Sequence, residues 1–275
     1  MSEVSPARAL AFEVIRASFE RDAFTERAFR AAAEQRGSDG RERAQAQRLA
    51  YGAVQRRGSS DAAIERLAER PLRRLDPPVL AALRLGLYEL LFADATPDHA
   101  AVDQAVELAK RAGAAHAAGL VNAVLRRAAR ERAELSASLL GDDSTPERAA
   151  VAHSAPPWLA RLWWEELGPD GARSLLAACN EPAEVAYRVN LLRTDRDAVL
   201  AKLRAAGIAA HSAASAVPYV PIGHKRNSGS QGAGEMIVVE GRTGEIVREL
   251  VAAGELTPQS RGSAAVGEVL DPRPG

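Results

Sequence analysis

The sequence has 275 residues, of which 47% are hydrophobic and 26% charged, and its 36 basic residues balance its 36 acidic ones. These values are those of a globular protein with room for one large or two ordinary domains, and they exclude disordered and collagen-like chains. The single cysteine excludes an intramolecular disulfide and a cysteine-rich zinc site. No leader pattern is visible, and no apolar stretch approaches the roughly 18 residues of a membrane span. The sequence therefore predicts a cytoplasmic protein with no membrane partner.

Arginine dominates the basic residues, because 33 of the 36 are Arg. The planar guanidinium suits bidentate contacts to phosphates and base edges better than a lysine ammonium does. A coding bias towards Ala, Arg and Gly would give the same enrichment without any RNA partner. Composition alone leaves these two explanations open.

Between residues 5 and 132 the apolar periodicity is helical almost throughout and predicts a compact all-α bundle of six helices. The fourth helix has the widest apolar stripe, over residues 79–91, and is expected to be the central one. The first helix is predicted to start at Ser5 and Pro6 and to break at Gly37–Gly40. The second ends at Gly58, and the third starts at Ser60 or Asp61 and ends before Pro71. The fourth starts at Asp76 and Pro77, the fifth runs from Pro97 to a left-handed cap at Gly113, and the sixth runs from about His116 to Arg132.

The second half has mixed patterns that predict a small α+β domain after a linker. Alternation over residues 184–190 indicates a strand, and residues 245–254 fit either a helix or a strand. Helices are expected at 156–167 and 171–179, divided by Gly168 and Pro169, and a third is capped by Thr194 and ends at Gly207. A flexible Gly/Ser-rich loop is expected at 223–234, a strand at 236–239 and a helix at about 260–269.

Two sets of motifs resemble known families. LAYGAVQRRGSSDAAIERL, LRLGLYELLFADATPDHAAVDQAVELAKRAG and LVNAVLRR, in this order, are similar to the NusB-like RNA-binding domain over nearly all of residues 5–132. HSAPPWLARLWWEELG, AYRVNLLRTDRDAVLAKLRAAG and LTPQSRGSAAVGEVLDPRPG resemble the middle portion of the RsmB/Sun family of ribosomal RNA cytosine-5 methyltransferases. The resemblance implies a mainly α protein, in which an N-terminal all-α NusB-like helical bundle is followed by a small α+β domain.

The resemblance also implies a domain plan. Residues 1–137 are expected to form the RNA-binding bundle, 138–152 a linker and 153–240 the small α+β domain. Residues 241–275 are expected to lead into a Rossmann-like methyltransferase domain that this sequence does not contain. The stretch 217–234 departs from the family, because a loop-like sequence stands where a strand-turn-strand is expected.

The expected chemistry depends on the Rossmann-like methyltransferase domain that this sequence does not contain. Methylation of cytosine carbon 5 needs an activated cysteine that adds to carbon 6, and a bound methyl donor. S-adenosylmethionine is the cofactor of the full-length family, but this chain shows no donor-binding loop, so no catalytic residue and no cofactor are assigned to it. Cys179 lies among apolar residues at helical spacing and is interpreted as a buried structural thiol. No histidine pair has ligand spacing, so no metal site is predicted.

The basic residues carry the functional prediction, because RNA binding requires cations gathered on one face. Each alone fits an ordinary solvated charge, and the resemblance favours them as a set. The candidate RNA-binding residues are Arg8 and Arg16, then Arg48, Arg56 and Arg57, then Lys110 and Arg111 with Arg126, Arg127 and Arg130.

The sequence thus favours the RNA-binding N-terminal portion of a ribosomal RNA cytosine-5 methyltransferase, without the catalytic domain. Its expected partners are ribosomal RNA and its own missing catalytic domain, and no motif for DNA readout is present. The alternative is a NusB-type antitermination or regulatory RNA-binding protein. The second half argues against that alternative, because a standalone factor does not need it.

Overall fold

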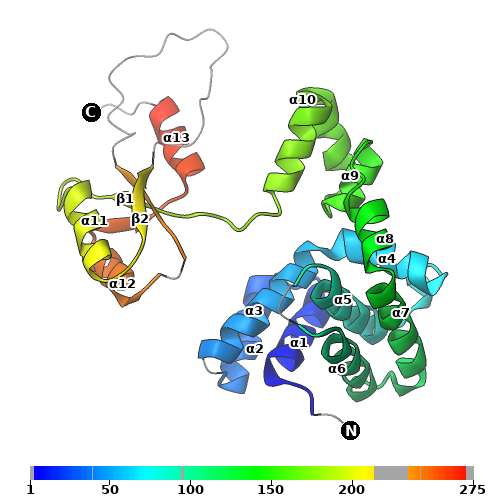
Figure 1. Ribbon diagram of the computed structural model, residues 1–275. Helices are drawn as coiled ribbons and strands as arrows, with labels where there is room; N and C mark the ends of the chain where they lie inside the picture. Colours follow the sequence, from blue (N-terminus) through cyan, green and yellow to red (C-terminus); the bar gives the residue numbers. More distant parts are fainter. Residues whose placement is uncertain (1–2, 39, 94–95, 214–234, 242, 271–275) are drawn as a thin grey trace. The chain divides into compact units, whose positions relative to one another are not determined.

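The computed structural model describes residues 3–38, 40–93, 96–213, 235–241 and 243–270 (Figure 1). The chain divides into two compact units, a helical unit over Met1–Glu181 and an α/β unit over Pro182–Gly275. The stretch 217–234 that departs from the family, including the predicted flexible loop at 223–234, lies outside the described residues.

The helical unit begins as the sequence predicts. Ser5 is the N-cap of the first helix, its side-chain oxygen accepts a hydrogen bond from the backbone N–H of Arg8 at 3.4 Å, and Pro6 is the first helical residue. The helices of this unit are α1 (Pro6–Glu20), α2 (Thr25–Arg36), α3 (Gly40–Gln55), α4 (Arg57–Ala68), α5 (Pro77–Leu91), α6 (Asp98–Arg111), α7 (Ala118–Arg130), α8 (Arg132–Leu135), α9 (Pro146–Ala152) and α10 (Pro157–Ala178).

One predicted boundary is wrong. The sequence was interpreted as a single helix from Ser5 to the break at Gly37, but the chain leaves the helix after Glu20 and begins α2 at Thr25. The turn contains neither Gly nor Pro. Asp22 supplies the left-handed conformation instead, with φ of 50°, which Asp tolerates better than most residues. The break at Gly37 is confirmed, and Gly37 has φ of 59°.

Helix α5 is the most deeply buried helix of the unit, as its apolar stripe predicts. Leu83, Leu85 and Leu87 are fully buried, and α1, α3, α4, α6 and α7 pack around α5. The contact with α3 is close at Gly52, where an added Cβ would lie 2.1 Å from Cζ of Tyr88. Small residues at such crossings let large side chains of the neighbouring helix fill the space.

Residues 138–181 group with the helical unit, although the sequence suggested a linker followed by part of the α+β domain. Helix α9 packs against α4 and α10, and the Ser59 hydroxyl donates to the carbonyl oxygen of Val151 at 2.6 Å. A small apolar core holds α9 and α10 together. Its buried members are Ala149, Ala150, Ala160 and Leu176. The break predicted inside α10 is confirmed at Gly168, which has φ of 72°.

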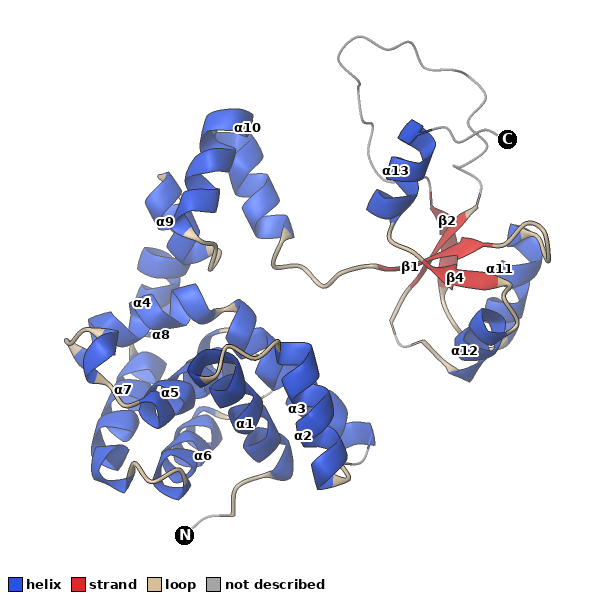
Figure 2. Ribbon diagram, turned by 180° about the vertical axis from the view of Figure 1, so that it is seen from behind, coloured by secondary structure: helices blue, strands red, loops and turns tan. Residues whose placement is uncertain are grey.

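The α/β unit is a four-stranded antiparallel sheet with the order β2-β3-β1-β4 (Figure 2). Two strand-helix-strand units follow one another in the chain and are interleaved in the sheet, so that each helix joins two strands that are not neighbours. Its elements are β1 (Val185–Val189), α11 (Arg196–Ala205), β2 (Ala210–Ala213), β3 (Met236–Val239), α12 (Glu245–Ala252), β4 (Leu256–Pro258) and α13 (Arg261–Leu270).

Helices α11 and α12 cover one face of this sheet, with Val199 and Leu250 in the same buried cluster as Tyr187 and Ile237. Ala264 of α13 packs against the other face (Figure 2). Two details differ from the sequence prediction. Asp195 rather than Thr194 caps α11, because its carboxylate accepts from the N–H of Ala198 at 2.8 Å. In addition, α12 and β4 complete the α/β unit, so the fold of this unit extends past residue 240.

Candidate nucleic-acid interface

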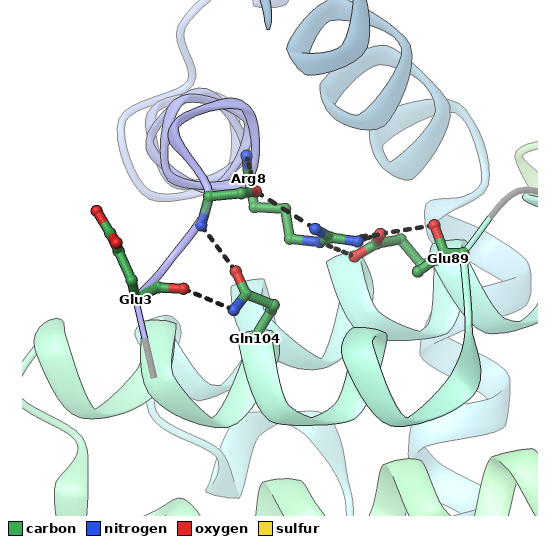
Figure 3. Close-up of polar contacts among 6 residues, drawn as sticks. Glu3, Arg8, Glu89 and Gln104 are labelled. Carbon is green, nitrogen blue, oxygen red and sulfur yellow. Dashed lines mark hydrogen bonds and ion pairs between the residues drawn. The ribbon is translucent and has the colours of Figure 1, made fainter. Parts of the chain in front are cut away.

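A buried ion pair fixes the first helix on the central one. The guanidinium of Arg8 donates from Nη2 to Oε1 of Glu89 at 2.7 Å and from Nε to both carboxylate oxygens at 3.1 Å (Figure 3). The Arg8 side chain is 12% exposed and that of Glu89 1%. The Thr96 hydroxyl donates to the same carboxylate at 3.1 Å. Because the pair is nearly water-free and well hydrogen-bonded, Arg8 positions α1 rather than offering a charge to a ligand.

A second contact holds the N-terminal end of α1 against α6. The side-chain amide of Gln104 accepts from the backbone N–H of Ser5 at 2.8 Å and donates to the carbonyl oxygen of Glu3 at 2.9 Å (Figure 3). One amide thus satisfies a backbone donor and a backbone acceptor of the approaching chain. These bonds set the distance between α1 and α6, which form two walls of the cavity described next.

Arginines from four segments line one cavity of the helical unit, which has a volume of about 420 Å³. Arg16 lies on α1, Arg21 on the turn that follows, Arg36 at the end of α2 and Arg111 at the end of α6. We call this cavity the arginine groove. Its remaining lining residues are Val4, Ala9, Phe12, Glu13, Leu108 and Ala112.

Three of the four guanidinium groups are held in place by carboxylates. Arg16 makes two hydrogen bonds to Glu20, at 2.6 and 2.7 Å, and these bonds raise the pKa of Arg16 above its ordinary value. Arg36 contacts Glu13 at 2.9 Å. Arg111 lies 3.5 Å from the buried carboxylate of Glu107. The Arg36–Glu13 pair is exposed, and exposed pairs contribute little to stability, so a phosphate can replace this carboxylate at small cost. Arg111 has to keep its contact with Glu107, because that carboxylate is buried.

Arg21 differs from the other three. Its side chain is exposed, and within the described residues it has no hydrogen bond or ion pair. The backbone that carries it is fixed, because the N–H groups of Arg21 and Ala23 both donate to the carbonyl oxygen of Ala17 at 3.2 Å. The groove therefore combines three oriented cations with one that is open to a ligand.

Sequence reasoning missed Arg21 and Arg36, and the missed turn is the reason. In one continuous helix, 20 residues would separate Arg16 from Arg36 by about 30 Å. The turn at residues 21–24 folds α2 back along α1 and brings Arg36 within 2.9 Å of Glu13. The available signal was the short polar run Arg21–Asp22, since Asp favours turns and left-handed backbone.

The second predicted group is dispersed. Arg48 is exposed on α3, whereas Arg57 pairs with Asp61 at 3.3 Å. Arg56 lies half-buried over the ring of Phe92, 4.9 Å from the ring centroid. Burial lowers the pKa of Arg56 below its ordinary value, which marks the environment as a packed aromatic contact rather than an open cation.

The third predicted group separates into two places. Lys110 and Arg111 end α6, and Arg111 lines the arginine groove, whereas Arg126, Arg127 and Arg130 end α7. Arg127 is held by Glu131 at 2.9 Å, by Glu69 at 3.0 Å and by the carbonyl oxygen of Leu67, and the two carboxylates raise its pKa. Arg126 donates to the Asn122 side chain, and Arg130 is exposed.

Two further observations concern sites other than the groove. Cys179 is exposed at the C-terminal end of α10, so the prediction of a buried thiol is wrong; Leu176 is the residue of this last turn that is buried. The described residues contain no group of three or more His, Cys, Asp or Glu side chains able to hold a metal ion. None of the described helices is both long and apolar enough to cross a membrane.

The architecture defines a class of protein in which a helical bundle with an arginine-lined groove precedes a βαββαβ module. Residues 5–130 match the NusB family, and residues 155–220 match the ferredoxin-like domain of RsmF/B-like methyltransferases. The chain therefore combines a NusB domain with the ferredoxin-like domain of that methyltransferase group, as the sequence motifs indicated.

Individual relatives agree with this assignment. A probable ribosomal RNA small subunit methyltransferase B of Synechocystis is 30% identical over 98% of this chain and 56% of its own length. Ribosomal RNA small subunit methyltransferase B of Pseudomonas putida is 36% identical over 62% of this chain and 38% of its own length. The chain thus spans about half the length, or less, of these curated relatives.

One solved structure resembles the whole fold. The crystal structure of PH0851 superimposes on 100% of this chain and 58% of its own, with a TM-score of 0.62 and 18% identity. At this identity the likeness concerns the fold alone, and it supports a mainly helical protein with a small antiparallel sheet.

Proposed function

We propose that this chain is the RNA-recognition portion of a ribosomal RNA cytosine-5 methyltransferase and that the arginine groove binds the RNA backbone. The observation that carries the proposal is the convergence of Arg16, Arg21, Arg36 and Arg111 on one cavity. Guanidinium groups match phosphate oxygens in geometry and charge, and clustered cations release counterions when a nucleic acid binds.

Ribosomal RNA is the proposed ligand because relatives over the matched region are ribosomal RNA small subunit methyltransferases. Of the residues predicted from the sequence, Arg16 and Arg111 belong to the groove. Lys110 adjoins it in the chain, and Arg48, Arg126 and Arg130 are exposed elsewhere on the helical unit. We assign the main contacts to the groove, because it is the cavity in which cations from separate segments meet.

The NusB-type antitermination factor is the weaker reading. The match to the ferredoxin-like domain extends over residues 155–220, and the Synechocystis relative aligns over nearly the whole chain. A factor that acts through its helical bundle alone does not require these residues. The methyltransferase context therefore accounts for more of the sequence.

S-adenosylmethionine is the donor that we propose for the methyltransferase group. Such cofactors bind at the carboxyl ends of parallel strands beside a glycine-rich turn. The sheet described here is antiparallel, so its described residues do not fit that donor. No step of methyl transfer is derived from them.

The test is binding of a ribosomal RNA hairpin, measured by fluorescence anisotropy at several salt concentrations. The double variant R21Q/R36Q removes two groove cations, and R126Q/R130Q removes the same charge from α7. We expect R21Q/R36Q to lower the affinity for the hairpin and to make it less dependent on salt, and R126Q/R130Q to leave both quantities near wild type. Equal effects of the two variants would contradict binding in the arginine groove, and no binding by the wild type would contradict RNA recognition.

A further inference from the structure

An aromatic side chain stands exposed in the turn that carries Arg21. Phe24 is 74% exposed and precedes the first residue of α2. The phenylalanines that precede and follow it in the chain pack against the core, Phe19 partly buried and Phe29 at 4% exposure. Phe24 is therefore the exposed aromatic residue of a hairpin whose other phenylalanines pack into the core.

The ring of Phe24 has one covered face. The guanidinium of Arg27 lies over it, 5.3 Å from the ring centroid. An arginine on one face holds the ring in a fixed orientation and leaves the opposite face free for a second flat group.

The turn that presents Phe24 is itself fixed. Besides the two backbone bonds to Ala17, the hydroxyls of Ser18 and Thr25 form a hydrogen bond of 3.1 Å across the turn, which joins α1 to α2. Arg21 lies three residues before Phe24 and lines the arginine groove. The aromatic ring and one of the four groove arginines are therefore on one short, well-anchored segment.

We propose that Phe24 is a stacking platform for an unpaired nucleobase whose neighbouring phosphates lie in the arginine groove. This inference rests on the proposed function and adds a specificity-determining residue to it. Cations alone bind any nucleic acid backbone, whereas an exposed aromatic face selects strands whose bases are splayed out. The segment from Glu20 to Arg27 carries both acidic and basic side chains, so its own charge does not decide the occupant. We choose a nucleic acid because Arg21, three residues before Phe24, lines the arginine groove.

The experiment uses a short single-stranded RNA that carries 2-aminopurine, and a fully paired duplex of the same length. F24L keeps the apolar bulk but removes the π-face, and F24Y keeps the π-face as the matched control. Stacking contributes about 1–3 kcal/mol per base, so F24L should bind the single strand about 5- to 150-fold more weakly. The salt dependence should not change, because no ion pair is lost.

Three other readouts complete the design. The 2-aminopurine emission should be quenched on binding to wild type and F24Y, and less on binding to F24L. Duplex affinity should be equal for all three proteins. If F24L binds the single strand as wild type does, the stacking proposal is wrong while groove binding stands. If F24L instead lowers self-association in sedimentation without changing RNA affinity, Phe24 is a contact between copies and the proposal is likewise wrong.

Failure of the underlying function has a different signature. If wild type binds neither the single strand nor the duplex, RNA recognition by the groove is excluded together with the stacking role. Thermal unfolding of F24L serves as the folding check. Because Phe24 is largely exposed, its unfolding midpoint should be close to that of wild type.

Discussion

The arginine groove and the C-terminal end of α7 are both rich in arginine, but they are built differently. The groove collects four arginines from segments that are distant in the chain, whereas Arg126, Arg127 and Arg130 lie on a single helix. On α7 the spacing places the three side chains on one side of the helix, but Arg127 is bound to Glu69 and Glu131. The comparison shows that intramolecular ion pairs can occupy an arginine that the sequence alone offers as a free cation.

The largest expected effect tests whether α1 is held in place by the buried pair. E89A leaves the Arg8 guanidinium buried without its carboxylate, which should lower the free energy of unfolding by about 3–5 kcal/mol. Urea denaturation followed by circular dichroism measures this. The control R130A, an exposed position on α7, should differ from wild type by less than about 0.5 kcal/mol. Similar losses in both variants would refute the special role of the pair.

The second effect separates the two arginine regions directly. R21Q/R36Q should reduce the slope of log affinity against log salt by about 1.4 to 1.8, since each phosphate contact contributes about 0.7 to 0.9. R126Q/R130Q changes the net charge equally and should leave the slope unchanged. Anisotropy titrations with a ribosomal RNA hairpin measure both slopes. A larger change of this slope in R126Q/R130Q would mean that the RNA binds at the end of α7 and not in the arginine groove.

The third effect concerns the packing of α3 against α5. G52A places a Cβ against the Tyr88 ring, and such overpacking should cost about 1–3 kcal/mol, reduced by the better helix propensity of Ala. G119A on α7 is the matched control, because its Cβ would have no atom within 4 Å, and it should stabilise by up to about 1 kcal/mol. Chemical denaturation gives both values. Stabilisation by G52A would show that Tyr88 moves aside freely.

The smallest effect tests the carboxylate inside the groove. Glu13 pairs with Arg36 and opposes an incoming phosphate, so E13Q should raise RNA affinity by about 1.4- to 5-fold, the equivalent of a surface ion pair of about 0.2–1 kcal/mol. E165Q, an exposed carboxylate on α10, makes the same charge change outside the groove lining and should have a smaller effect. Unchanged or weaker binding by E13Q would mean that Glu13 orients Arg36 for the ligand.

Most helices could be predicted because their signals are local. Ser5 with Pro6, Asp76 with Pro77, and the left-handed Gly37 and Gly113 mark starts and stops that need no knowledge of the rest of the chain. The turn at residues 21–24 was missed because it lacks Gly and Pro and depends on Asp22 accepting a strained backbone. Docking of α9 and α10 on the helical unit was missed for a related reason, since alanines such as Ala149 and Ala160 carry little sequence signal but pack closely.

The sequence by itself determined the helical character of the first half, the α+β character and two of the four strands of the second, and the abundance of arginine. Only the tertiary structure decided which arginines are available. Arg8 and Arg127 are bound by carboxylates from other parts of the chain, and Arg36 reaches the groove because a turn reverses the direction of α2. Secondary structure follows from residues a few positions apart, whereas a cluster of charges depends on where distant segments meet, and that is set by the packing of α1 against α2 and α6.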